Sequence, residues 1–105
     1  MDTPKNRMRP VHPGEVLREE FLVPLGMSAN ALALALHVPA NRITMLAGEK
    51  RALTADTALR LARYFGTSAE FWLNLQKGYE LRVAERAIGP ELKAIRPSKG
   101  KASAA

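Results

Sequence analysis

The chain of 105 residues contains no cysteine, only two histidines and no long apolar segment. The lack of cysteine excludes disulfide bonds, a thiol nucleophile and the common cysteine-ligated zinc sites. Two histidines are too few for a histidine-rich metal site. The longest apolar run extends only from Ala31 to Leu36, far short of the roughly 20 residues of a membrane-spanning helix. We therefore expect no metal, no cofactor and no membrane span.

The first residues also lack the apolar segment that follows the charges of a secretory signal. The hydrophobic fraction of 47% and the charged fraction of 25% are typical of a folded globular protein. A chain of this length forms one domain with a modest core. The sequence thus predicts a small, soluble, cytoplasmic protein.

The net charge of +6 is concentrated at the two ends of the chain. Residues 1–12 carry a net charge of +2 and residues 91–105 carry +3, so residues 13–90 hold only +1. Basic arms beside a nearly neutral core can follow a phosphate backbone and gain affinity by releasing counterions. Short basic tails can equally serve only to keep a small protein in solution.

The first amphipathic pattern begins after Pro13, a residue that suits the first position of a helix. Leu17, Phe21 and Leu25 recur every four residues and form an apolar face. Gly26 follows Leu25 as a stop signal. We expect Pro24 to end this helix early, because proline cannot donate the backbone hydrogen bond and its ring clashes with the preceding turn.

Caps and glycine stops predict four more helices, and no two segments have the pattern of paired strands. The Ala-Leu repeat of residues 29–36 favours a helix, because alanine is the best helix former. The fold class is therefore all-α with five helices. The second and third helices are residues 29–36 after the cap Ser28, and a segment from Pro39 to Gly48 with Ile43, Leu46 and Ala47 inward. The fourth helix covers residues 55–65 after the cap Thr54 and contains an Asp56–Arg60 pair. The fifth helix begins at a capping box formed by Thr67 and Glu70, continues to about Arg86, and is closed by Gly89 and Pro90.

Only His37 and Val38 separate the second and third helices. So short a connection forces the two helices to cross sharply, as in a helix-turn-helix, whose second helix lies in the major groove of DNA. We therefore expect a flexible basic N-terminal arm over residues 1–11, a helix-turn-helix DNA-binding and dimerisation domain over residues 12–88, and a basic disordered C-terminal tail over residues 89–105.

Polar side chains on and around the third helix are suited to DNA, although a bundle of short helices with a polar face explains the same pattern. Base contacts are expected from Asn41 to adenine, from Arg42 to guanine, and from Thr44 or Met45 to a thymine methyl group. Phosphate contacts are expected from Ser28 and Asn30 at the start of the second helix, and from Lys50 and Arg51 after the third.

Three stretches of the sequence resemble a known family. They are His-Pro-Gly-Glu-Val-Leu-Arg-Glu-Glu-Phe-Leu from His12, Pro-Leu-Gly-Met-Ser with the later Val-Pro-Ala-Asn-Arg-Ile, and residues 50–76, from Lys-Arg-Ala-Leu-Thr-Ala-Asp-Thr to Glu-Phe-Trp-Leu-Asn-Leu-Gln. Over residues 8–86 the chain resembles the HigA family of antitoxins, which are phage-repressor-like helix-turn-helix proteins of the XRE class. The resemblance implies a five-helix fold, a homodimer, repression of its own operon, and neutralisation of a HigB-type ribonuclease that cleaves mRNA on the ribosome.

The resemblance supports the same DNA contacts but also reveals departures from the family pattern. Ala29 stands where glutamine is common, which removes one expected contact. His37 stands where the turn commonly has glycine, and it can adopt the left-handed conformation only at some cost. Gly48 and Glu49 replace Asn-Gly, so that Glu49 brings a negative charge near the phosphates. These departures affect the operator sequence and the affinity rather than the fold.

The helix after Thr67 is longer than one small core requires. Its apolar residues Trp72, Leu75, Tyr79 and Val83 lie on one stripe, which suits either the core or a dimer interface. We expect part of this stripe to pair with a second subunit. A two-fold dimer would present two recognition helices about one DNA turn apart and bind an inverted repeat in double-stranded operator DNA.

A toxin that binds mRNA is expected to be basic, so an acidic surface favours its binding. The densest acidic cluster is formed by Glu15, Glu19 and Glu20 on the first helix. We hypothesise that this helix and the preceding arm contact the toxin. A solvated helix face explains the same cluster equally well.

No group of residues has the pattern of a catalytic site. Ser28, His37 and Asp56 lack the nucleophile elbow and oxyanion loop of a hydrolase, and Glu19 and Glu20 are neighbours that do not share a helix face. We expect no enzymatic activity. The alternatives to an antitoxin are a stand-alone XRE-type transcriptional regulator without a toxin partner, and a protein-binding helical adaptor.

Overall fold

The computed structural model describes residues 9–99, and every regular element in that range is helical. Because α2, η1 and α3 follow one another without a break, residues 9–99 form the five helical segments that the sequence predicts. Most of the expected N-terminal arm and the end of the expected C-terminal tail lie outside residues 9–99. The elements are α2 (Pro13–Val16), η1 (Leu17–Leu22), α3 (Val23–Leu25), α4 (Ala29–Leu36), α5 (Ala40–Ala47), α6 (Ala55–Phe65) and α7 (Ala69–Ala94).

The first helical segment does not end early at Pro24, as the sequence suggested. It continues to Leu25 and ends at Gly26, which has a left-handed conformation with φ 64°. The six residues of η1 form a π-helix, and Val23 N–H donates to Arg18 O, five residues back. The backbone before Pro24 therefore already lacks the regular hydrogen bonds between residues four apart that a proline would interrupt.

The π-helix also changes which residues face the core. Leu17 and Leu22, five residues apart, are both buried, and Phe21 is half-buried against the core. Leu25, which the four-residue spacing placed on the inward face, is 60% exposed. That prediction is wrong because the wider turn rotates every later residue around the helix axis.

Gly14 brings the first helix into direct contact with α5. A Cβ atom at this position would lie 1.8 Å from the carbonyl oxygen of Leu46 and 2.9 Å from its carbonyl carbon. Because both are backbone atoms, no rotation of a side chain could relieve the overlap. Glycine at this position therefore sets how closely α2 can approach α5.

The core forms where the first segment packs against α4, α5, α6 and the beginning of α7. Trp72 is completely buried, and its ring packs against Phe21 with the ring centroids 5.0 Å apart. Its indole N–H donates to the Thr67 hydroxyl over 2.8 Å. The predicted capping box at Thr67 is wrong, because Ser68 is the cap and accepts from Phe71 N–H over 3.0 Å.

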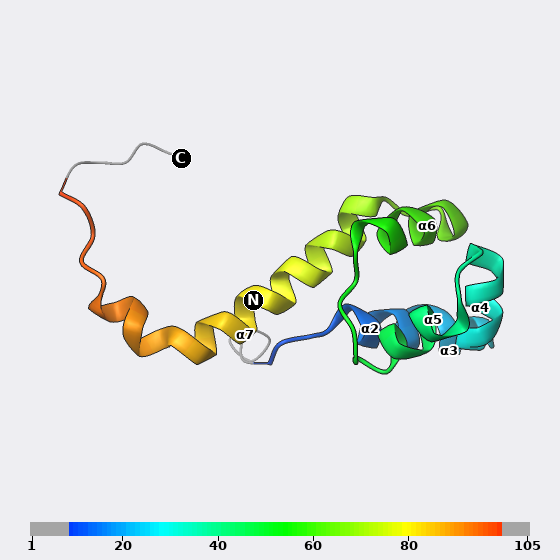
Figure 1. The fold of residues 1–105 in the computed structure, drawn as a ribbon, viewed down its shortest axis with the longest axis horizontal. Helices are drawn as coiled ribbons and strands as arrows, with labels where there is room; N and C mark the ends of the chain where they lie inside the picture. The colour runs from blue at the N-terminus through cyan, green and yellow to red at the C-terminus, as the bar shows by residue number, and fades with distance from the viewer. Residues whose placement is uncertain (1–8, 100–105) are drawn as a thin grey trace.

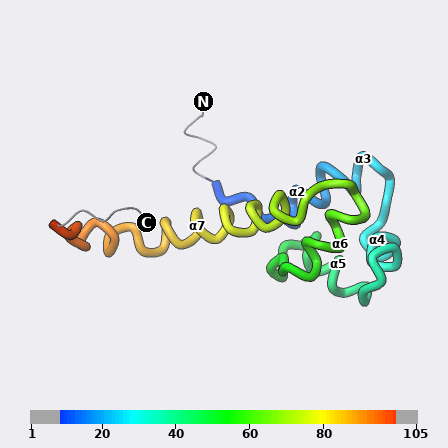
Figure 2. Tube along the Cα trace, turned by 90° about the horizontal axis from the view of Figure 1, so that it is seen from above, coloured from blue at the N-terminus to red at the C-terminus, as the bar shows by residue number. Residues whose placement is uncertain are grey.

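The last helix, α7, consists of two helical stretches joined by a kink at Ile88, so the first stretch ends close to the predicted Arg86, and the second continues through Gly89 and Pro90 to Ala94. Ile88 leaves the helical conformation, with φ −117° and ψ 20°, two residues before Pro90. This kink accommodates the proline ring, which would clash with the preceding turn of a straight helix. Part of the expected disordered tail is thus helical. The second half of α7 projects away from the body formed by the other helices (Figures 1 and 2).

Within residues 9–99, no single helix is long and apolar enough to cross a membrane. Only the first segment and α4 taken together pass such a test, and they are bent by 97° relative to each other. The same residues contain no cluster of three His, Asp or Glu side chains that could hold a metal ion.

Candidate nucleic-acid interface

Helices α4 and α5 form the sharp turn that the sequence predicts. His37 ends α4 in the left-handed conformation, with φ 62°, although it lacks the freedom of glycine. Val38 N–H donates to Ala33 O over 3.1 Å, which closes the end of α4. Pro39 follows in an extended conformation and is the N-cap residue of α5. The backbone therefore changes direction within three residues.

Helix α5 has one buried face and one exposed face, as expected. Ile43, Leu46 and Ala47 are buried in the core. Asn41, Thr44 and Met45 lie on the exposed face. These three side chains combine an amide, a hydroxyl and a thioether, so the exposed face can make both hydrogen bonds and apolar contacts with base edges.

Arg42 lies at the edge of that exposed face and is bound to α6. Its Nη1 atom donates to Asp56 Oδ1 over 2.7 Å, and 32% of its side chain remains exposed. The partner lies in the first turn of α6, across a small polar cleft of about 170 Å³. Sequence reasoning missed this pair, because the two residues are 14 positions apart and no helical spacing connects them.

Asp56 also forms the predicted pair with Arg60, over 2.7 Å. The guanidinium of Arg60, and to a smaller extent that of Arg42, holds the pKa of Asp56 below its usual value. Arg60 Nη1 additionally donates to Leu36 O over 2.8 Å, at the end of α4. The N-terminal part of α6 therefore contacts both helices of the helix-turn-helix.

The expected phosphate-binding residues flank the exposed face of α5. Ser28 and Asn30 are exposed at the start of α4, where the Ser28 hydroxyl accepts from Ala31 N–H over 3.0 Å. Lys50 and Arg51 are exposed directly after α5. The structure thus places all eight predicted DNA-binding residues around α4 and α5.

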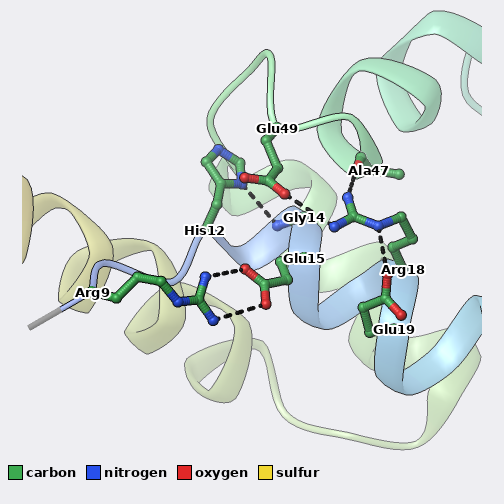
Figure 3. Close-up of polar contacts among 8 residues, drawn as sticks. All are labelled: Arg9, His12, Gly14, Glu15, Arg18, Glu19, Ala47 and Glu49. Carbon is green, nitrogen blue, oxygen red and sulfur yellow. Dashed lines mark hydrogen bonds and ion pairs between the residues drawn. The ribbon is translucent and has the colours of Figure 1, made fainter. Parts of the chain in front are cut away.

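The C-terminal end of α5 is held by Arg18 of the first helix (Figure 3). Its guanidinium donates to Ala47 O and pairs with Glu49 over 3.1 Å and with Glu19 over 2.9 Å. Glu49 has a left-handed conformation with φ 62°, which is uncommon for a residue other than glycine. Because Arg18 pairs with Glu49, the negative charge expected near the phosphates is partly neutralised.

His12 has a structural role. Its buried ring accepts from Gly14 N–H through Nδ1 over 2.9 Å and so caps α2 (Figure 3). Burial lowers the pKa of His12, although Glu49 and a backbone hydrogen bond to Arg51 oppose the shift. The ring also meets Tyr79 edge-on, with centroids 4.8 Å apart. His12 therefore connects the first helix to α7 and to the segment after α5.

The acidic cluster on the first helix is less negative than the sequence suggests. Glu15 accepts two hydrogen bonds from Arg9, over 2.9 and 3.1 Å, and these lower the pKa of Glu15 (Figure 3). Glu19 pairs with Arg18, while Glu20 is exposed. The sequence assigned Arg9 to a separate basic arm, so its pairing with Glu15 was not foreseen.

The four residues expected at a dimer interface have different environments. Trp72 has no exposed surface and belongs to the core, so its assignment to an interface is wrong. Leu75 and Tyr79 are half-buried within the subunit, and Val83 is 41% exposed. Other apolar side chains on α7 and just beyond it are also exposed, although they lie outside the stripe that helical spacing defines. They are Leu81, Ile88, Leu92 and Ile95.

Comparisons with known proteins agree with this geometry. A helix-turn-helix family model matches residues 17–72. The chain is 58% identical to virulence-associated protein I of Dichelobacter nodosus, over 78% of this chain and 76% of that protein. It is 39% identical to antitoxin HigA-1 of Vibrio cholerae, over 89% and 88% of the two chains. The structure of the Pseudomonas aeruginosa antitoxin HigA with the higBA promoter is similar, with a TM-score of 0.82 and 49% identity over 85% of this chain and 98% of that one.

Proposed function

The chain belongs to the HigA family of helix-turn-helix proteins, and from this premise we propose that it is a DNA-binding antitoxin. In this role it represses its own operon and neutralises a HigB-type ribonuclease that cleaves mRNA. One observation carries the proposal: α4 and α5 present an exposed polar face in a fold that a HigA antitoxin with promoter DNA shares. We infer that the protein acts in the cytoplasm, where an operator and the mRNA on ribosomes are found, and that it acts by binding rather than by catalysis.

We assign sequence recognition to the exposed face of α5. Asn41 has the donor and acceptor that pair with adenine, and Thr44 and Met45 offer methyl groups to thymine. Arg42, at the edge of this face, has the planar donor pair that matches guanine. Because α5 is only eight residues long, these side chains can read only a short half-site.

We assign the part of the DNA affinity that does not depend on base sequence to the residues on either side of this face. Lys50 and Arg51 supply positive charge after α5, and Ser28 and Asn30 lie at the amide-rich start of α4. Contacts of this kind release counterions, so binding weakens steeply as salt increases.

We propose that the protein acts as a homodimer on an inverted repeat. Val83 and the apolar side chains exposed beyond it on α7 would be covered by a second subunit. Two recognition helices related by two-fold symmetry bind half-sites separated by roughly 34–36 Å, or one turn of DNA. Sedimentation that shows only monomer at micromolar concentrations would exclude this arrangement.

We propose that the toxin contacts the first helix through the acidic cluster of Glu15, Glu19 and Glu20. Glu20 is exposed, and the pairs that Arg9 and Arg18 make with the other two can exchange for cations of the toxin. Charge reversal at Glu15 and Glu19 is expected to weaken neutralisation. Unchanged neutralisation by that double variant would refute the surface while leaving the antitoxin function intact.

The experiment that tests the proposed function is co-expression with the protein encoded beside this chain. An antitoxin restores growth when the neighbour inhibits it, and the two proteins purify together. A stand-alone XRE-type regulator binds its promoter but neither rescues growth nor binds the neighbour. A helical adaptor shows no salt-sensitive promoter binding at all.

A further inference from the structure

Asp56 connects the recognition helix to the rest of the helix-turn-helix. Its Oδ1 atom accepts from Arg42 on α5 and from Arg60 on α6, each over 2.7 Å. Arg60 in turn donates to Leu36 O, over 2.8 Å, at the point where α4 ends. The carboxylate is therefore fixed relative to the turn, and it holds one nitrogen of Arg42.

The contact leaves part of the Arg42 guanidinium available for DNA. Only Nη1 binds Asp56, and no hydrogen bond or ion pair within residues 9–99 engages Nη2 or Nε. Arginine recognises guanine through two donors of one planar group. Because Asp56 holds Nη1, the planar guanidinium cannot turn freely, and its two remaining donors, Nε and Nη2, point in a defined direction.

The charge balance allows Asp56 to remain beside DNA. A lone carboxylate would repel the phosphates, but Asp56 lies between two guanidinium groups and the three side chains together carry a net positive charge. An ordinary aspartate is already ionised at neutral pH, and the two guanidinium groups lower the pKa of Asp56 further. The group can therefore orient Arg42 without opposing the approach of the duplex.

We propose that Asp56 determines specificity as a positioning residue: it holds Arg42 so that one guanine is read, and it contacts no base itself. This inference rests on the proposed function, because it requires that α5 enters the major groove. The residue that selects the base pair is on α5, whereas the residue that orients it is on α6.

The test measures the affinity of the full-length protein for its own promoter and for a panel of single base-pair substitutions. Arg42→Ala first identifies the base pair that Arg42 reads. Asp56→Asn is expected to reduce discrimination at that pair roughly tenfold and to leave the other positions unchanged. In the Arg42→Ala background, Asp56→Asn is expected to have no further effect on discrimination, because the side chain that it orients is missing.

Two further variants separate orientation from charge and from folding. Glu49→Gln removes the same charge close to the end of α5, but its partner Arg18 is on the first helix, so affinity should change equally for all sequences. Asp56→Glu keeps the negative charge at the N-terminus of α6 but moves the carboxylate, and it should relax the same base pair. Circular dichroism of each variant confirms that it is folded.

The outcomes distinguish the inference from the proposed function. If Asp56→Asn changes affinity equally for every sequence, or changes nothing, Asp56 does not position a base-reading side chain and the inference is overturned. Specific promoter binding by the wild-type protein would still stand in that case. If the wild-type protein does not prefer its promoter over random DNA, the proposed function fails and the inference fails with it.

Discussion

Replacing Gly14 with alanine should strongly destabilise the protein, because the first helix and α5 touch through their backbones. The added Cβ would lie 1.8 Å from Leu46 O, whereas real Cβ atoms essentially never come closer than 3.0 Å to another atom. The two helices would have to separate by more than about 1 Å, and no side-chain rotation could prevent it. Overpacking of a core costs roughly 1–3 kcal/mol, and a rigid backbone overlap belongs at the upper end of that range.

A loss of about 3 kcal/mol should lower the midpoint of thermal unfolding by roughly 10–20 °C for a domain of this size. Thermal unfolding followed by circular dichroism measures this shift. The matched control is Gly78→Ala on α7, where an added Cβ meets no atom within 4 Å. That control should be neutral or stabilising by up to about 1 kcal/mol, since alanine favours helices more than glycine does. A Gly14→Ala variant as stable as the control would refute this account of the contact.

Three further predictions follow from the site. Asn41→Ala should cost roughly 1–3 kcal/mol of discrimination at one base pair. Lys50→Ala should lower the affinity for all DNA sequences alike and reduce the slope of log affinity against log salt concentration by roughly one. Titrations of substituted operators at several salt concentrations check both. The lowered pKa of His12 means that the unfolded chain binds a proton more readily, so stability should fall as pH drops below about 6.5, and urea unfolding of His12→Asn should lack this loss. Arg9 lowers the pKa of Glu15, so the ionised Glu15 stabilises the fold above the ordinary glutamate pKa, and this stabilisation is lost as pH falls through the lowered pKa. The free energy of unfolding of Glu15→Gln should therefore fall less with decreasing pH than that of the wild type, as measured by circular dichroism.

Local signals predicted the helix-turn-helix almost to the residue. Ser28 and Thr54 cap α4 and α6, and Gly66 ends α6 in a left-handed conformation with φ 74°. Each of these signals acts over three or four neighbouring positions, so a single sequence contains all the information. The inward and outward faces of α5 followed from helical spacing in the same way.

Features that depend on other parts of the chain could not be predicted from local spacing. The π-helix before Pro24 rotates Leu25 away from the core, and no cap or repeat marks it. The Arg42–Asp56 pair connects two helices that only the folded chain brings together. Trp72 had the spacing of an interface residue, but it is completely buried and packs against Phe21, which comes much earlier in the sequence.

Footprinting of the DNA upstream of the gene is the measurement that tests DNA recognition by α5 most directly. Two protected half-sites of inverted sequence are expected, with centres roughly 10–10.5 base pairs, or one helical turn, apart. Protection is also expected to disappear when Asn41, Thr44 and Met45 are replaced together by alanine, while the protein stays folded. Equal protection by that triple variant, or no protected site with the wild-type protein, would contradict the claim that the exposed face of α5 reads the operator.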